Sequence, residues 1–284
     1  MKEINQSLHN KGIYRFHSLD FLKFVLTLVI VFHHFQQCTN TKFTHFNFFF
    51  GWIYFGYAVE FFFIISGFVC ALGIFQNPPK SFRNWIQKKA IRIYPMSIIS
   101  VCVTLGVYLL HRTLLGKLPD GVNIGLWRFT NSLTLTYTGG GINLGIGINN
   151  PIWYLNVLLI CYVVVYGLIW LSRKLGISVL YGFLAMCVLG IGVVNYNINL
   201  PFLNGQTGRG YAAFFLGMVL FYLTRRGQPS NHLLFVALIG IAATGVSLHF
   251  KSLCDNQWGI FTFILFPSVL VVALRLEWLF KWGF

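Results

Sequence analysis

Long apolar runs alternate with short basic segments along the whole chain. Eight of these runs are close to the ~20 residues that a helix needs to cross the hydrocarbon core of a membrane. They predict eight helical spans, with ends accurate to a few residues, at 20–37, 52–75, 93–111, 151–171, 178–196, 209–224, 231–250 and 258–274. A short amphiphilic piece, 126–138, is expected to be interfacial or re-entrant. The pattern therefore predicts an all-α polytopic transmembrane helical bundle.

Composition excludes the other broad classes of protein. Only 10% of the residues are charged, whereas a soluble domain usually carries about 25%, and the mean hydropathy is +0.69. The apolar runs are continuous, whereas outer-membrane strands alternate apolar and polar residues over about ten positions. A helical membrane protein in contact with the lipid bilayer is therefore expected.

The basic residues between the runs predict the orientation. With the N-terminus in the cytoplasm, 15 of the 21 Lys and Arg residues fall inside, in agreement with the excess of positive charge in cytoplasmic loops. The net charge of +15 is thus a topology signal and does not indicate nucleic-acid binding. We expect a multi-pass protein of the cell inner membrane, with a cytoplasmic tail at 1–14, a membrane domain at 15–274, and 275–284 as a short cytoplasmic tail or the start of a missing segment.

The first predicted span carries ionisable side chains. Asp20 and Lys23 are i, i+3 neighbours that can partly neutralise each other. Lys23 and His34 are separated by almost three helical turns, so they share a face roughly 16 Å apart. A neutral imidazole can take a proton from a hydroxyl group, which makes His34 the candidate catalytic base and Lys23 its candidate partner. The alternative is a helix-end histidine bonded to a neighbouring span. His33 points about 100° away from His34 and should have a different role.

The second span contains Glu60 in an otherwise aromatic helix, followed by Ser66 and Gly67. A carboxylate bonded to one nitrogen of an imidazole fixes the tautomer of the ring and supports base catalysis, so Glu60 is a candidate catalytic residue. Pairing with another basic group is an equally good reading. Ser66 and Gly67 most simply allow close packing of helices, although Ser66 is also a candidate substrate contact.

A basic cluster precedes the third span, where Pro95 is expected to lie near the start of a helix. Such a cluster could bind the phosphates of a nucleotide-like donor, and an anchor on the cytoplasmic side is the alternative. The candidate donor-binding residues are Arg83, Lys88, Lys89 and Arg92.

Three further positions are candidate contacts for an acceptor. Trp153 suits a membrane interface, and the amide of Asn156 can both donate and accept a hydrogen bond. Arg209 opens the outer end of the sixth span. The alternatives are an interfacial anchor for Trp153 and Arg209, and a bond to a neighbouring helix for Asn156.

Taken together, these segments resemble the membrane acyltransferase 3 family. The matching motifs are Leu-Asp-x-Leu-Lys followed by His34, Gly-x-x-Val-Glu-x-Phe-Phe-x-x-Ser-Gly-Phe at 56–68, Lys-x-x-Arg-Ile-x-Pro at 89–95, Trp-x-Leu at 153–155 and Phe-Leu-Gly-Met at 215–218. The resemblance implies a cytoplasmic acyl-CoA donor, commonly acetyl-CoA, as co-substrate. It also implies a hydroxyl acceptor on a cell-surface carbohydrate or lipid-linked glycan, with acylation completed at or beyond the outer face. By position, His34 is the base, Lys23 its basic partner, and Lys89 and Arg92 the donor-binding pair.

The chain departs from the family pattern in two ways. Family members commonly have ten spans, so this chain is either a short member or a truncated product. Leu158 and Leu159 stand where many members carry Glu-Glu, so the acceptor sugar is not identified by the sequence.

Two rival functions are weighed against the acyltransferase. A non-enzymatic transporter or flippase for a glycan would also carry intramembrane ionisable residues. A metal enzyme would need clustered histidines, and His33-His34 is the only adjacent pair among eight. No metal and no permanently bound cofactor are expected.

Overall fold

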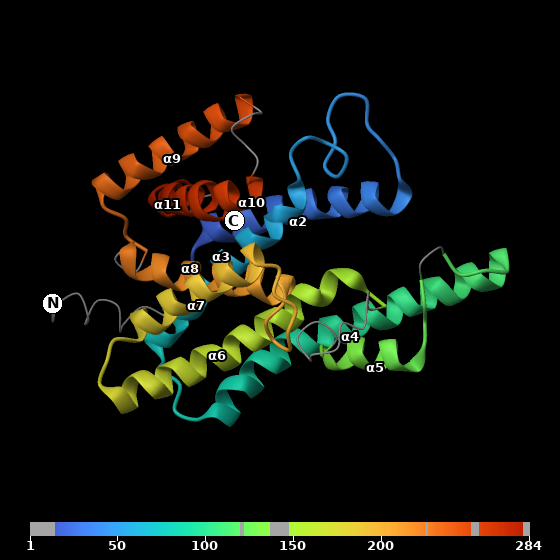
Figure 1. Cartoon of the computed structure of the whole chain (residues 1–284), viewed down its shortest axis with the longest axis horizontal. Helices are drawn as coiled ribbons and strands as arrows, with labels where there is room; N and C mark the ends of the chain where they lie inside the picture. The colour runs from blue at the N-terminus through green and yellow to red at the C-terminus, as the bar shows by residue number, and fades with distance from the viewer. Residues whose placement is uncertain (1–14, 120–121, 137–147, 225–226, 251–255, 281–284) are drawn as a thin grey trace. The chain divides into compact units, whose positions relative to one another are not determined.

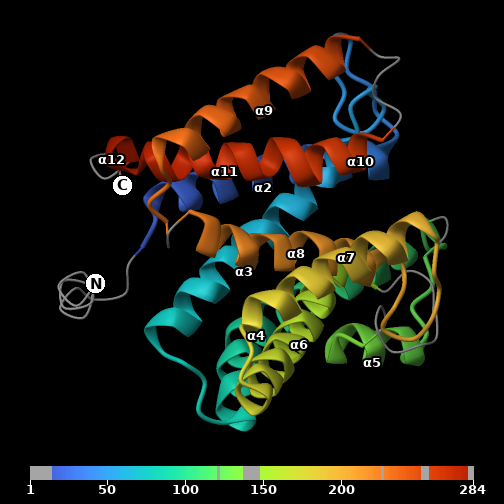
Figure 2. The ribbon, with the colours of Figure 1, turned by 60° about the vertical axis from the view of Figure 1, so that its left-hand side comes forward.

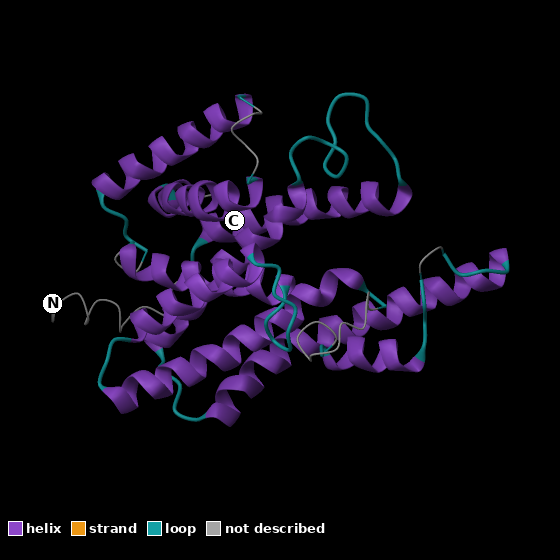
Figure 3. Ribbon diagram, in the orientation of Figure 1, coloured by secondary structure: helices purple, strands orange, loops and turns teal. Residues whose placement is uncertain are grey.

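The computed structural model describes residues 15–119, 122–136, 148–224, 227–250 and 256–280. These residues form helices joined by turns and loops, with no strand among them (Figure 3). The predicted class, an all-α polytopic helical bundle, is therefore confirmed. The expected tail at 1–14 lies outside the described residues.

Each of the eight predicted spans contains a helix, but the helices are not equally apolar. Among the described residues, six segments are long and apolar enough to cross a membrane: His17–Thr39, Phe55–Gln76, Phe82–Leu115, Asn150–Leu175, Asn231–His249 and Gln257–Arg275. Helix α7, Val179–Asn195, is apolar but has only 17 residues. Helix α8, Gly205–Leu223, opens on a polar turn that contains Gln206, Thr207 and Arg209.

The chain divides into two compact units. The terminal unit comprises 1–58 and 223–284 and holds α2 (His17–Thr39), η1 (Phe55–Tyr57), α9 (Asn231–His249), α10 (Gln257–Ile260), the π-helical turn η4 (Phe261–Leu265), α11 (Phe266–Arg275) and α12 (Glu277–Phe280). The central unit comprises 59–222 and holds nearly all of α3 (Ala58–Gln76), α4 (Phe82–Leu115), α5 (Leu126–Thr134), η2 (Asn150–Ile152), α6 (Trp153–Leu175), α7 and α8.

In the terminal unit, α11 packs beside α9 and α2 (Figures 1 and 2). The first turn of α2 is held by Glu277 of α12. One carboxylate oxygen accepts a hydrogen bond from the backbone N–H of His17 at 2.7 Å, and the other accepts from the N–H and the hydroxyl of Ser18 at 3.0 and 2.5 Å. The first turn of a helix leaves its N–H groups without partners, and its dipole favours a negative charge there. Glu277 therefore anchors the start of α2, although it lies after residue 274, the predicted end of the membrane domain.

In the central unit, α3 and α8 cross at two glycines. A Cβ at Gly67 would overlap the carbonyl oxygen of Phe214, and a Cβ at Gly217 would overlap the carbonyl oxygen of Ile64. Helix association in lipid depends on van der Waals packing rather than on the hydrophobic effect. Interfaces between membrane helices are therefore enriched in small residues, which let two backbones approach closely. The core of the unit lies around this crossing, where Phe63, Ile64, Phe68, Phe214 and Phe215 are completely buried.

Helix α4 begins at Phe82, eleven residues before the predicted start of the third span at 93, and continues through Pro95 to Leu115. The hydroxyl of Ser81 caps it by accepting from the N–H of Asn84 at 3.4 Å. The prediction that Pro95 lies near a helix start is therefore wrong. Hydropathy marks only the apolar part of a helix, and membrane helices tolerate an internal proline. The basic cluster consequently lies on the first turns of α4.

The amphiphilic segment 126–138 contains the short helix α5. Leu126 and Trp127 are exposed, whereas Asn131 and Ser132 are buried. The backbone N–H of Ile148 donates to the hydroxyl of Ser132 at 3.0 Å. Thr130 and Thr134 are exposed as well, so the exposed side of α5 is amphiphilic, as the sequence predicts, and its buried side is polar.

Gly67→Ala should lower the unfolding temperature of the purified protein in detergent. The added methyl group forces α3 away from α8, and overpacking of this kind typically costs about 1–3 kcal/mol. Gly167→Ala in α6 is the matched control, because a Cβ there meets no atom within 4 Å. Equal unfolding temperatures for the two variants would contradict the close crossing.

Candidate functional site

Helix α2 carries Lys23 and His34 as half-buried side chains. The ammonium of Lys23 lies 3.2 Å from one oxygen of Asp20, and Nε of Arg15 lies 2.6 Å from the other. Asp20 is thus shared between two cations, so it neutralises Lys23 only in part. Nδ1 of His34 lies 2.9 Å from Oε1 of Gln37. With Oε1 of Gln37 as the acceptor, Nδ1 carries the proton of the neutral ring and Nε2 keeps its lone pair.

His33 has different surroundings from His34. It is only 2% exposed, and its Nδ1 lies 3.0 Å from the carbonyl oxygen of Phe48. Its ring meets the rings of Phe49 and Tyr54 edge to face, with centroids 5.2 and 5.0 Å away. The two histidines thus differ in burial and in hydrogen-bond partners, and their separate roles stay a prediction. Within the described part of the chain, no three His, Cys, Asp or Glu side chains gather closely enough to hold a metal ion.

Two glutamines hold the loop that follows α2. Oε1 of the buried Gln36 accepts from the N–H of Phe48 at 2.6 Å. Gln257 of α10 accepts from the N–H of Tyr54 at 3.2 Å and donates to the carbonyl of Trp52 at 2.8 Å. The loop between α2 and η1 is therefore held at Phe48, Trp52 and Tyr54.

Glu60, Trp153 and Arg209 come together in the central unit. The carboxylate of Glu60 is completely buried and binds Arg209 through two bonds, Nε to Oε1 at 2.5 Å and Nη2 to Oε2 at 2.9 Å. The guanidinium lies 5.2 Å from the centre of the Trp153 ring. All three residues belong to the first turns of α3, α6 and α8, where helix dipoles favour a carboxylate. Of the two roles left open for Glu60, the structure shows the pairing with another basic group.

Ser66 and Asn156 are both held inside the central unit. The hydroxyl of Ser66 lies 2.8 Å from the hydroxyl of Tyr154, so it forms part of the contact between α3 and α6. Asn156 is only 2% exposed, and its Nδ2 has no hydrogen-bond partner among the described residues. A buried donor without a partner costs about 1–3 kcal/mol, so the Asn156 amide has donor capacity for a water molecule or a substrate.

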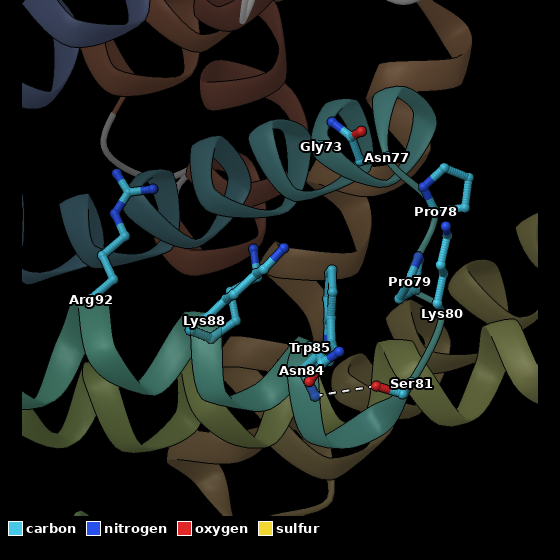
Figure 4. Close-up of a pocket in the computed structure, with 11 residues that line it drawn as sticks. Gly73, Asn77, Pro78, Pro79, Lys80, Ser81, Asn84, Trp85, Lys88 and Arg92 are labelled. Carbon is cyan, nitrogen blue, oxygen red and sulfur yellow. Dashed lines mark hydrogen bonds between the residues drawn. The ribbon is translucent and has the colours of Figure 1, made fainter.

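A pocket of about 600 Å³ lies between the end of α3 and the first turns of α4 (Figure 4). Its wall includes Gly73 and Asn77, the turn at 78–81, and one side of α4. The residues that line it include no carboxylate. They do include four cations, Lys80, Lys88, Lys89 and Arg92.

Lys89 differs from the other three cations because two aromatic rings hold it. Its ammonium lies 4.6 Å from the ring centre of Trp85 and 4.6 Å from that of Tyr162. The indole N–H of Trp85 in turn donates to the carbonyl of Tyr162 at 2.9 Å. The rings join α4 to α6 at the edge of the pocket.

The sequence predicted most of the cations that line the pocket, but it did not predict the aromatic ring of Tyr162 beside Lys89. Three of the four predicted donor-binding residues line the pocket, whereas Arg83 does not. Lys80 lines it and was read from the sequence only as a topology signal. Tyr162 lies far from Lys89 in the sequence, so no spacing could have indicated it. Gln37 follows His34 by three positions, so helical geometry could have identified it as a partner.

Removing one partner of the buried ion pair should destabilise the protein strongly. Arg209→Gln leaves the completely buried Glu60 charge without compensation, which typically costs about 3–5 kcal/mol, and Glu60→Gln should cost less, because the Arg209 side chain is 24% exposed. The double variant removes both charges and should lose clearly less stability than the sum of the single losses. Thermal unfolding of the three variants in detergent measures the difference. Additive losses would show that the two side chains do not depend on each other.

Comparison with protein families identifies the family of the chain. A family model described as an acyltransferase domain matches residues 16–283. Comparison with curated proteins and with solved structures gives no match. The matched residues include α2, the pocket of the central unit and Glu277. Because the match takes in nearly the whole chain, the protein belongs to the acyltransferase 3 family and is a multi-pass membrane acyltransferase.

Proposed function

We propose that this membrane acyltransferase takes its acyl group, acetyl being the expected one, from acyl-CoA bound at the pocket of the central unit. The observation that carries the proposal is the set of four cations without a carboxylate in the lining. Coenzyme A is a polyanion, and Lys and Arg side chains are the usual partners of phosphate. A volume of about 600 Å³ lies within the range of about 300–1,000 Å³ typical of small-molecule sites.

The proposed acceptor is a hydroxyl group of a cell-surface carbohydrate or lipid-linked glycan. In direct transfer, Nε2 of His34 takes the hydroxyl proton while the oxygen attacks the thioester carbonyl carbon. The carbon–sulfur bond then breaks, and the thiolate of coenzyme A leaves and takes up a proton. In the alternative route, His34 first carries the acyl group itself and then passes it to the hydroxyl. Both routes depend on the lone pair that the bond to Gln37 leaves on Nε2.

The remaining polar residues support binding in this proposal. Lys23 supplies positive charge on the same helix as His34, and Glu60 positions Arg209. The Trp153 ring and the Asn156 amide suit the apolar face and the hydroxyl groups of a sugar. Ser66 contributes through its bond to Tyr154.

The proposed location is the inner membrane with the N-terminus in the cytoplasm, as the distribution of Lys and Arg indicates. On this topology, which rests on the sequence alone, the first turns of α4 face the cytoplasm and His34 lies near the outer face. The family match identifies an acyltransferase, so the transport function considered from the sequence is set aside.

His34→Ala should reduce transfer of labelled acetyl from acetyl-CoA to glycan in membranes by about 10²–10⁴-fold, the usual contribution of a general base. His232→Ala replaces an exposed histidine of α9 and should keep the wild-type rate. Unchanged label transfer in His34→Ala would remove His34 from the reaction.

Arg92→Met should raise KM for acyl-CoA, and the increase should be larger at low salt, because exposed charges are screened as ionic strength rises. Arg83→Met is the matched control: Arg83 lies on the same helix but does not line the pocket. Steady-state kinetics with varied acyl-CoA measure both variants. Equal effects of the two substitutions would show that only the charge of the cluster matters and that the pocket does not bind the donor.

A further inference from the structure

The four cations of the pocket are held in two different ways. Lys80, Lys88 and Arg92 are exposed, whereas Lys89 is half-buried. The Lys89 ammonium rests against the rings of Trp85 and Tyr162 at equal distances of 4.6 Å. A long lysine side chain that is free in solvent samples many rotamers, so the two rings restrict the position of this cation alone.

A ring and a carboxylate hold an ammonium group with different consequences. A carboxylate supplies a full negative charge and cancels the field of the cation. A ring attracts the cation through its quadrupole and leaves the positive charge in place for another anion. Because no carboxylate lines the pocket, the charge of Lys89 is oriented there without being neutralised.

The two rings are themselves fixed. Trp85 precedes Lys89 by four positions on α4, so both side chains lie on one face of the helix. Its indole N–H donates to the carbonyl oxygen of Tyr162 on α6 at 2.9 Å. The ring of Tyr162 packs edge to face on Phe214 of α8, with centroids 5.7 Å apart. Lys89 is thereby connected to the buried core of the central unit.

We propose that Trp85 and Tyr162 are positioning residues for the donor, which hold the Lys89 ammonium ready to bind a phosphate group of acyl-CoA. This inference rests on the proposed function, because it takes acyl-CoA as the ligand of the pocket. Neither aromatic residue belongs to the charged cluster that the sequence singled out. The rings reduce the conformational entropy that Lys89 loses when the phosphate binds, which raises affinity without adding a charge.

The test compares KM for acyl-CoA with kcat in variants of the full-length protein. Tyr162→Leu removes one ring and should raise KM by about two- to tenfold, the effect expected when one more long side chain must be immobilised on binding, with kcat changed less than about twofold. Tyr162→Phe keeps the ring and should restore most of the affinity. Tyr166→Leu is the matched control, because Tyr166 lies one turn further along α6 and packs on Phe82 of α4. Equal increases of KM in Tyr162→Leu and Tyr166→Leu would overturn the proposal.

A double-mutant cycle separates this inference from the proposed function. Lys89→Met alone should raise KM for acyl-CoA, and Tyr162→Leu in that background should add little. If Lys89→Met leaves KM unchanged, the donor site itself is wrong. If Lys89→Met raises KM but Tyr162→Leu and Trp85→Leu do not, the site stands and only the positioning role fails. Fully additive effects of Lys89→Met and Tyr162→Leu on KM would also overturn the positioning role. If Tyr162→Leu does not fold, Trp85→Leu, which removes the second ring, replaces it in the double-mutant cycle.

Discussion

A charged side chain in a membrane helix is stable only when a partner compensates it or a polar cavity receives it, and this constraint organises both units. The three acidic residues in the described part of the chain each have partners. Asp20 binds Arg15 and Lys23, Glu60 binds Arg209, and Glu277 binds the first turn of α2. The carboxylates are thus used inside the protein, either to pair a cation or to hold the end of a helix.

Part of the excess of positive charge lies at the pocket of the central unit. The chain has a net charge of +15, and four of its cations line the pocket on α4, where no carboxylate is present. This is the location at which we propose that an anionic donor binds. The terminal unit supplies the complementary chemistry, because His34 has one ring nitrogen bonded to Gln37 and the other able to accept a proton. The family match shows an acyltransferase, and the proposed transfer from acyl-CoA would use both features, the cations to bind phosphate and the imidazole as a base.

The parts that could be predicted from the sequence were those with a local signal. Apolar runs located the helices, and the basic cluster before the third span located three of the four cations that line the pocket. The start of α4 was misplaced because Phe82 and the residues that follow form a polar helical extension, which hydropathy does not detect. Partners that depend on packing had no local signal. Arg209 for Glu60, Tyr162 for Lys89 and Glu277 for Ser18 are each far away in the sequence.

We propose that a donor bound at the cationic pocket supplies the acyl group to an acceptor on the opposite side of the membrane. The most direct test uses sealed vesicles that contain the purified protein in a single orientation, with labelled acyl-CoA supplied on one side and the glycan acceptor on the other. We predict label transfer when acyl-CoA faces the side of α4 that carries Lys89 and Arg92, and none when the two substrates are exchanged. Equal transfer from both sides, or transfer only when donor and acceptor share a side, would contradict the account.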